Sequence, residues 1–199
     1  MAVTGVVSPS QMLTNTGARP GDALILTKPL GTGVLFNACR SGRLPRSELD
    51  SVLPKVAALN GQAVEIAARH GVHACTDITG FALAGHGLEM AKGSGLSMDI
   101  EYAALPVHPN VLEMYSKGET TGSNAANRKL VAGRLEMAVK LSAIQQELLY
   151  DPQTSGGLLL SVAADQADAL LRSLHEAENL DAAIIGQAKG KGEGGIRIV

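Results

Sequence analysis

The stretch TDITGFALAGH, residues 76–86, carries the clearest fold signal in the chain. A short run from His73 to Thr76 precedes it and predicts a strand. Apolar residues at helical spacing then follow, namely Phe81, Ala84, Leu88 and Ala91. A strand therefore gives way to a helix here, and we expect that helix to end near Gly93 or Gly95.

Outward from this stretch, the same spacing rules predict one long helix upstream. Ser47 is placed to cap it, and its apolar side would be formed by Val52, Val56, Leu59, Ala63, Ile66 and Ala67. His70 would lie in its last turn, and Gly71 would follow its end. Further helices are expected at 34–39, 135–149 and 165–177, and strands at 23–27, 96–102, 158–162, 182–185 and 196–199.

The remaining segments predict connections. Residues 117–128 are polar and rich in Gly, Thr and Asn, which predicts a loop, and residues 190–195 predict a turn that would make a hairpin of the last two strands. Residues 1–20 predict an extended arm or linker between domains. Because strands and helices mix in 21–199 without strict alternation or internal repeat, we expect one α+β domain with helices packed on a sheet.

Composition excludes several classes of protein. The chain has 199 residues, 45% of them hydrophobic, so it can bury a core. Its net charge of -2, without a basic stripe, argues against nucleic-acid binding. It shows no signal-peptide pattern and no run of about 18–20 apolar residues, so we expect a cytoplasmic protein without a membrane span. Cys39 and Cys75 form neither a disulfide framework nor a zinc motif, and reduced, partly buried thiols are expected.

Asp77 is the first candidate for chemistry. It lies where the strand at 73–76 ends, and a carboxylate at a strand end can hold Mg²⁺, which prefers oxygen ligands. Thr79 and Gly80 would open the helix, whose free N–H groups favour an anion. The alternative is that Asp77 or Thr79 only caps the helix.

The stretch DPQTSGGLL, residues 151–159, is the second candidate. Thr154, Ser155 and Gly156, followed by Gly157, could form a loop that binds a phosphate, or could merely shape a tight entry into the next strand. The stretch lacks the lysine of a P-loop.

Two basic residues are weaker candidates. In LTKPLGTGV, residues 26–34, Lys28 could reach a phosphate as a point charge, or could lie in solvent beside a turn shaped by Pro29, Gly31 and Gly33. His86 stands alone near a Gly-rich turn, which is more typical of a structural histidine than of a catalytic one.

At these three stretches the sequence resembles the selenophosphate synthetases (selenide, water dikinases). The opening VTGVV with GARPGDALILTKPLGTGV resembles the family's passage into its second domain, and TDITGFALAGH and DPQTSGGLL resemble two of its signatures. The resemblance implies a layered α/β/α domain similar to the C-terminal domain of aminoimidazole ribonucleotide synthetase. It also implies a two-domain subunit in a homodimer, with an N-terminal ATP-binding domain that this sequence does not contain.

The resemblance also implies a reaction and site residues. ATP, selenide and water would give selenophosphate, AMP and phosphate, with Mg²⁺ neutralising the phosphate charge. Asp77 matches the family's magnesium ligand in this domain, whereas the other ligands, the ATP-binding lysine and the reactive Cys or selenocysteine belong to the N-terminal domain. The family usually has Gly at Ala82, where we expect an ordinary helical backbone with φ < 0, and the segment around Asn127 is a looser match.

Three functions are therefore compared. The first is the C-terminal domain of a selenophosphate synthetase, inactive when isolated. The second is the same domain of a sibling ATP-dependent synthetase or kinase, and the third is a non-catalytic dimerisation or binding module. The sequence of the N-terminal half would distinguish them, since a Cys or selenocysteine followed by a Lys in a glycine-rich segment would favour selenide.

Overall fold

The computed structural model describes residues 4–9, 12–177, 179 and 181–199. The strands of this part of the chain are β1 (Ala23–Leu26), β2 (Ala74–Asp77), β3 (Leu96–Ile100), β4 (Leu135–Met137), β5 (Leu158–Val162), β6 (Ala183–Lys191) and β7 (Gly195–Ile198). They form one sheet in the order β2-β5-β1-β6-β3-β7-β4. Neighbours from β2 to β3 are antiparallel, whereas β7 is parallel to both β3 and β4.

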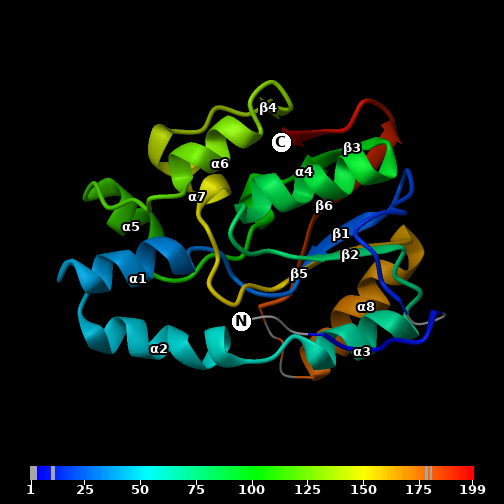
Figure 1. Cartoon of the computed structure of the whole chain (residues 1–199), viewed down its shortest axis with the longest axis horizontal. Helices are drawn as coiled ribbons and strands as arrows, with labels where there is room; N and C mark the ends of the chain where they lie inside the picture. Colours follow the sequence, from blue (N-terminus) through cyan, green and yellow to red (C-terminus); the bar gives the residue numbers. More distant parts are fainter. Residues whose placement is uncertain (1–3, 10–11, 178, 180) are drawn as a thin grey trace.

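Helices cover both faces of this sheet (Figure 1). They are α1 (Thr32–Arg40), α2 (Arg46–Ala57), α3 (Gly61–Arg69), α4 (Ala82–Ser94), α5 (Val111–Ser116), α6 (Asn124–Leu130), α7 (Ala143–Tyr150) and α8 (Ala164–Glu176), with a 3₁₀ turn at Tyr102–Ala104. The pair α3 and α8 packs on one face, and α4 lies on the other, in contact with α6 and α7. The predicted α/β/α layering is therefore confirmed.

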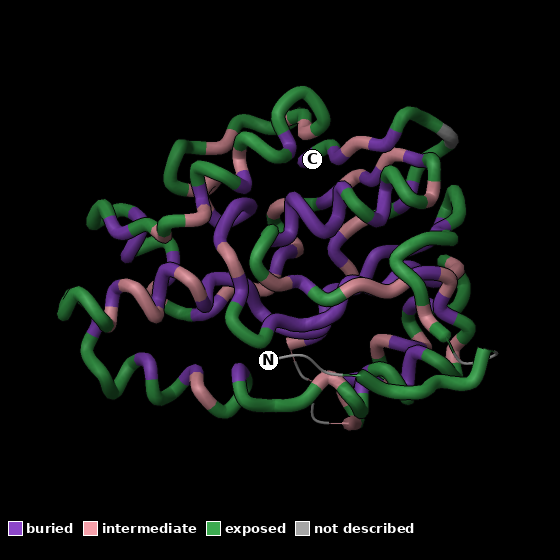
Figure 2. Tube along the Cα trace, viewed as in Figure 1, coloured by how far each residue is buried: buried purple, intermediate pink, exposed green. Residues whose placement is uncertain are grey.

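The strand β1 shows why the sheet needs both helical layers. Leu24 and Leu26 point into the core beneath α4, while Ala23 and Ile25 point into the core beneath α3 and α8. All four are buried, so the run reads as continuously apolar, as expected for a central strand covered on both faces. Burying each of the larger side chains contributes about 1.5–3 kcal/mol. Figure 2 shows this buried centre in purple.

The long helix predicted from Ser47 to His70 is wrong, because the chain breaks between α2 and α3. Leu59, assigned to its apolar side, is 88% exposed at the break. The apolar spacing of the two halves is real, but they bury different faces: Val52 and Val56 join the core near α1, whereas Ala63 and Ile66 pack with α8. A continuous 3.6-residue period cannot reveal such a change of partner.

Three other expectations near the C-terminal half are corrected. The segment 117–128 contains the start of α6, and 135–149 is not one helix but β4 followed by α7, whose first turn is closed by a capping box between Ser142 and Gln145. The last strand, β7, pairs with β3 and β4 rather than forming a hairpin with β6. These pairings are between segments distant in sequence, so local periodicity does not report them.

The described part of the arm lies against β2 and α4. The Cys75 N–H donates to the Thr14 carbonyl at 2.8 Å, and Gly17 and Ala18 both donate from their N–H groups to Ser94 Oγ at 3.1 Å. Its role as a linker between domains stays a prediction. In the described residues, no helix combines the length and apolar character needed to cross a bilayer.

Candidate functional site

Three loops meet at the end of the sheet where the strands β1 and β2 finish and β5 begins. Register pairs Asp77 with Leu158, and Leu26 with Leu159, so the stretches quoted from the sequence become spatial neighbours. Hydrogen bonds join the stretch 76–86 to the stretch 151–159. Ile78 N–H donates to the Gly157 carbonyl at 2.8 Å, and Gln153 N–H donates to the Thr79 carbonyl at 2.9 Å.

Asp77 is exposed at the last position of β2. Its carboxylate has no ion-pair or hydrogen-bond partner among the described residues, and it does not cap α4, which begins only at Ala82. Cys75 lies two residues back on the same side of the strand, and burial, aided by the charge of Asp77, raises the pKa of its thiol to about 11. Cys75 is therefore a protonated thiol at neutral pH and a poor nucleophile.

The loop Thr154–Gly156 is held by its backbone. The Thr154 N–H donates to Thr32 Oγ1 at 2.8 Å, and Ser155 adopts a positive φ of 50°. Gly156 has no room for a side chain, because a Cβ would collide with the carbonyl oxygen of Ile78. The side chains of Thr154 and Ser155 are exposed, so the loop presents two hydroxyl groups beside the end of β2.

Asp151 and Gln153 form a buried cap for α1, a role the sequence analysis did not assign. The Asp151 carboxylate accepts from Gly33 N–H and Val34 N–H at 3.0 and 2.9 Å. Gln153 Oε1 accepts from Gly31 N–H and Thr32 N–H at 3.0 and 3.2 Å. All four leading N–H groups of the helix are thereby satisfied, so this helix end is not free to bind an anion. The polar residues of the DPQ sequence, Asp151 and Gln153, stand between apolar runs, and this pattern was the sequence signal that could have predicted their role.

The charge on Asp151 is costly because the side chain is fully buried. Burial raises its pKa to about 6, although hydrogen bonds from Tyr115, Gln153, Gly33 and Val34 favour the ionised form. The Tyr115 hydroxyl donates to it at 2.6 Å, and burial together with this carboxylate raises the pKa of Tyr115 well above its ordinary range.

His86 is structural in its contacts. Its Nε2 accepts the Phe81 N–H at 3.3 Å and lies 3.1 Å from Thr79 Oγ1, while Nδ1 lies 3.1 Å from a Glu89 carboxylate oxygen. It thereby fixes the turn between β2 and α4. Asn127 supports the same turn, since its Nδ2 donates to the Gly80 carbonyl at 2.9 Å and is buried.

The expectation for Ala82 is wrong. Its φ is 63°, in the left-handed region, although a Cβ disfavours that conformation. The residue is fully buried at the first position of α4, so the turn made by Thr79 and His86 dictates the backbone. The strain lies next to the candidate loop, which is where such strain is commonly found.

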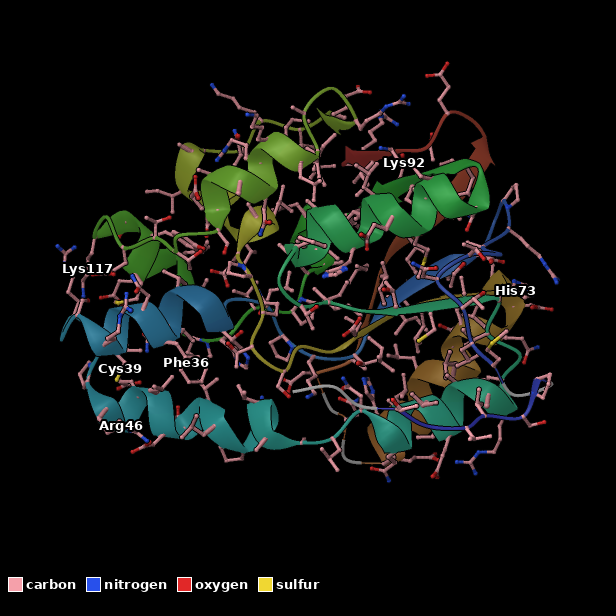
Figure 3. The ribbon with its side chains drawn as sticks, viewed as in Figure 1. Phe36, Cys39, Arg46, His73, Lys92 and Lys117 are labelled. Carbon is pink, nitrogen blue, oxygen red and sulfur yellow. The ribbon has the colours of Figure 1, made fainter. Side chains whose placement is uncertain are left out.

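The solvated alternative for Lys28 is also wrong. The side chain is 8% exposed, and its ammonium donates to the Ala58 carbonyl at 2.6 Å and to the Ser155 carbonyl at 3.1 Å. Burial lowers the pKa of this amine. Cys39 is remote from these loops, packed between α1 and α2 beside Phe36 (Figure 3). His73 lies at the opposite end of β2, where its Nδ1 contacts Asp22 at 2.9 Å.

The donor groups around Asp77 could supply only part of a magnesium site. No group of three or more His, Cys, Asp or Glu side chains in the described ranges could enclose a metal ion. A single exposed carboxylate beside two hydroxyl groups fits a hard cation only as one ligand among several, with phosphate oxygens completing the shell. Asp77 fits that limited role.

Comparison with known proteins identifies the family and relatives of this chain. The family described as "AIR synthase related protein, C-terminal domain" matches residues 19–199. The "Selenide, water dikinase" of Treponema denticola is 42% identical over 177 residues, covering 89% of this chain and 50% of that protein. That of Clostridioides difficile is 39% identical over 193 residues, covering 97% and 56%. The chain thus spans about half the length of these relatives.

Solved structures show the same fold at low identity. The hydrogenase maturation protein HypE has a TM-score of 0.67 at 22% identity, covering 93% of this chain and 49% of that one. Thiamine-monophosphate kinase from Stenotrophomonas maltophilia has a TM-score of 0.65 at 19% identity, covering 96% and 54%. The family model matches residues 19–199, nearly the whole chain, and the chain therefore belongs to the family of AIR synthase related C-terminal domains.

Proposed function

We propose that this chain is the C-terminal half of a selenide, water dikinase, which converts ATP, selenide and water into selenophosphate, AMP and phosphate. The similarity to dikinases, 42% and 39% identical over most of the chain, carries this proposal. The chain then supplies one face of a site whose other face lies in the half of the relatives that it does not match.

Asp77 is the proposed magnesium ligand of this half. The ion would neutralise phosphate charge as the phosphoryl group is transferred. The exposed carboxylate supports this role, because a metal or nucleotide could reach it without rearrangement of the fold. The other magnesium ligands, the ATP-binding lysine and the reactive Cys or selenocysteine would come from the N-terminal domain.

Thr154, Ser155 and Gly156 are the proposed phosphate contacts. They adjoin Asp77 across the β2–β5 end, and their hydroxyl and N–H groups are of the type that binds phosphate oxygens. We further propose a cytoplasmic homodimer of two-domain subunits, with ATP and selenide as the small-molecule substrates.

The proposal is tested by the activity of the long polypeptide, which is this chain joined to the proposed N-terminal domain. With ATP, Mg²⁺ and selenide, ³¹P NMR should detect selenophosphate, AMP and phosphate together, and the 199-residue chain alone should form none of them. If the long polypeptide phosphorylates a different acceptor and ignores selenide, the chain belongs to a sibling kinase or synthetase. Selenophosphate formation by the 199-residue chain alone would overturn the proposed division of labour.

A further inference from the structure

Two side chains donate hydrogen bonds to two successive carbonyl groups of the Thr154–Gly156 loop. Lys28 donates from Nζ to the Ser155 carbonyl at 3.1 Å, and Asn60 donates from Nδ2 to the Gly156 carbonyl at 2.9 Å. They come from different elements, one just after β1 and the other in the break between α2 and α3. Side chains therefore hold both of the loop's last two peptide groups.

These two hydrogen bonds orient the peptide groups and therefore the N–H groups of Gly156 and Gly157. In a trans peptide the carbonyl and the following N–H point in opposite directions, so the Gly156 N–H points away from the Lys28 ammonium, and the Gly157 N–H points away from the Asn60 amide. Neither group donates a hydrogen bond to a described residue. Two successive N–H groups without a partner among the described residues, after a residue with positive φ such as Ser155, resemble the backbone sites that bind anions.

The charge of Lys28 is more than a structural cross-link requires. The Lys28 side chain is 8% exposed, yet no carboxylate lies within ion-pair distance of it among the described residues. A neutral amide could bind the same carbonyls without the cost of burying a charge. A buried positive charge behind the peptide groups instead strengthens their N–H donors toward an anion on the opposite side.

The break between α2 and α3 serves the same loop. It leaves Leu59 88% exposed, which is unfavourable, but it brings the Ala58 carbonyl to Lys28 and the Asn60 side chain to Gly156. Asn60 is the residue before α3 and yet its side chain makes no capping hydrogen bond to that helix. Its amide is committed to the loop instead.

We propose that Lys28 and Asn60 are positioning residues that hold the N–H groups of Gly156 and Gly157 toward a bound phosphate. This inference rests on the proposed function in assuming a phosphate ligand, but it concerns residues that touch neither ligand nor metal. The recognised group is a polyphosphate chain with its bound divalent cation.

The probe for this inference is magnesium tripolyphosphate, added to the ¹⁵N-labelled chain of 199 residues. The amide signals of Gly156 and Gly157 should shift on titration. Asn60→Ala should weaken the apparent affinity at least about fivefold, since it frees one peptide group, and Lys28→Gln should do so by about tenfold because it removes the charge but keeps a donor.

Matched controls separate this effect from general damage. Gln62→Ala alters an exposed neighbour in α3, and Lys55→Gln removes an exposed lysine that pairs with Asp181. Both should bind as the unaltered chain does. Equal affinity in Asn60→Ala and the unaltered chain, or shifts confined to other amides, would overturn the inference. If the Gly156 and Gly157 signals shift as expected but the long polypeptide does not use selenide, the proposed function is contradicted and this inference is not.

Discussion

Asp77 lies directly opposite Leu158 in the antiparallel ladder between β2 and β5. This pairing places an exposed carboxylate at the exit of one strand beside the loop that enters the other. The carboxylate and the loop are more than 70 residues apart in sequence, yet the fold requires them to be neighbours. The candidate site therefore depends on the geometry of the loop as much as on the acid itself.

Replacing Gly156 should distort that loop. In Gly156→Ala the new methyl group collides with the Ile78 carbonyl and lies 2.8 Å from Gln153 Cβ, so the loop must move. We expect a loss of about 1–3 kcal/mol in the free energy of unfolding, measured by urea denaturation. Gly122→Ala is the matched control, because its Cβ meets nothing within 4 Å. Equal stability of the two variants would mean that the loop is not packed as described.

Asp151 should be far more important for stability than an exposed acid. In Asp151→Asn one carboxylate oxygen becomes an amide nitrogen, which faces either the Gly33 N–H or both the Val34 N–H and the Tyr115 hydroxyl, so part of the cap on α1 is lost. We expect a destabilisation of about 2–4 kcal/mol by thermal and urea unfolding. Asp50→Asn on α2, an exposed control, should change stability by less than about 0.5 kcal/mol.

The pH dependence of stability should carry two opposing contributions. The pKa of Asp151 is raised to about 6, so between about pH 4 and 6 the folded state binds more protons there than the unfolded state, and rising pH lowers stability. Burial, with the charge of Lys55, lowers the pKa of His108 to about 4. Between that value and about 6.5 the unfolded state binds more protons at His108, so rising pH increases stability.

Difference measurements separate the two groups. Stability of the unaltered chain minus that of Asp151→Asn should fall as pH rises from about 4 to 6, and the corresponding difference for His108→Gln should rise as pH rises from about 4 to 6.5. Urea unfolding at several pH values provides both curves. A flat difference for Asp151→Asn would show that its pKa in the folded protein is ordinary.

Ala82→Gly should be tolerated unusually well. Glycine relieves the strain of a φ of 63°, which offsets its greater entropy loss and the loss of a buried methyl group, so we expect a change within about 1 kcal/mol. Ala84→Gly, at a buried position inside the same helix, has no strain to relieve and should cost about 2 kcal/mol. If Ala82→Gly costs as much as Ala84→Gly in urea unfolding, the backbone at 82 is ordinary helix.

The sequence predicted those helices and strands whose own apolar pattern matches the face or faces that they bury. The strands near 23–27 and 158–162 and the helix at 165–177 appear as β1, β5 and α8, because covered strands read as apolar runs and α8 buries one stripe. The prediction for the segment 135–149 was wrong because β4 is an edge strand of only three residues, which pairs with the distant strand β7. Pairing between distant segments leaves no local period.

The site was only partly readable for the same reason. Asp77 stood out as an acid at a strand end, and the structure leaves it exposed. The conformations of Ala82 and Lys28 could not be inferred, since each is set by contacts with residues remote in sequence or by the turn around His86. Asp151 and Gln153 are buried polar residues that cap a helix end more than 110 residues away.

Magnesium dependence of the long polypeptide, measured with Asp77→Asn, tests the central claim most directly. The variant should need at least about tenfold more Mg²⁺ for half-maximal formation of AMP, because a charged ligand becomes neutral. Its thermal unfolding should match that of the unaltered protein, since the carboxylate has no partner among the described residues, and Asp50→Asn should keep the original Mg²⁺ requirement. An unchanged Mg²⁺ requirement in Asp77→Asn would contradict the assignment of this carboxylate to the metal.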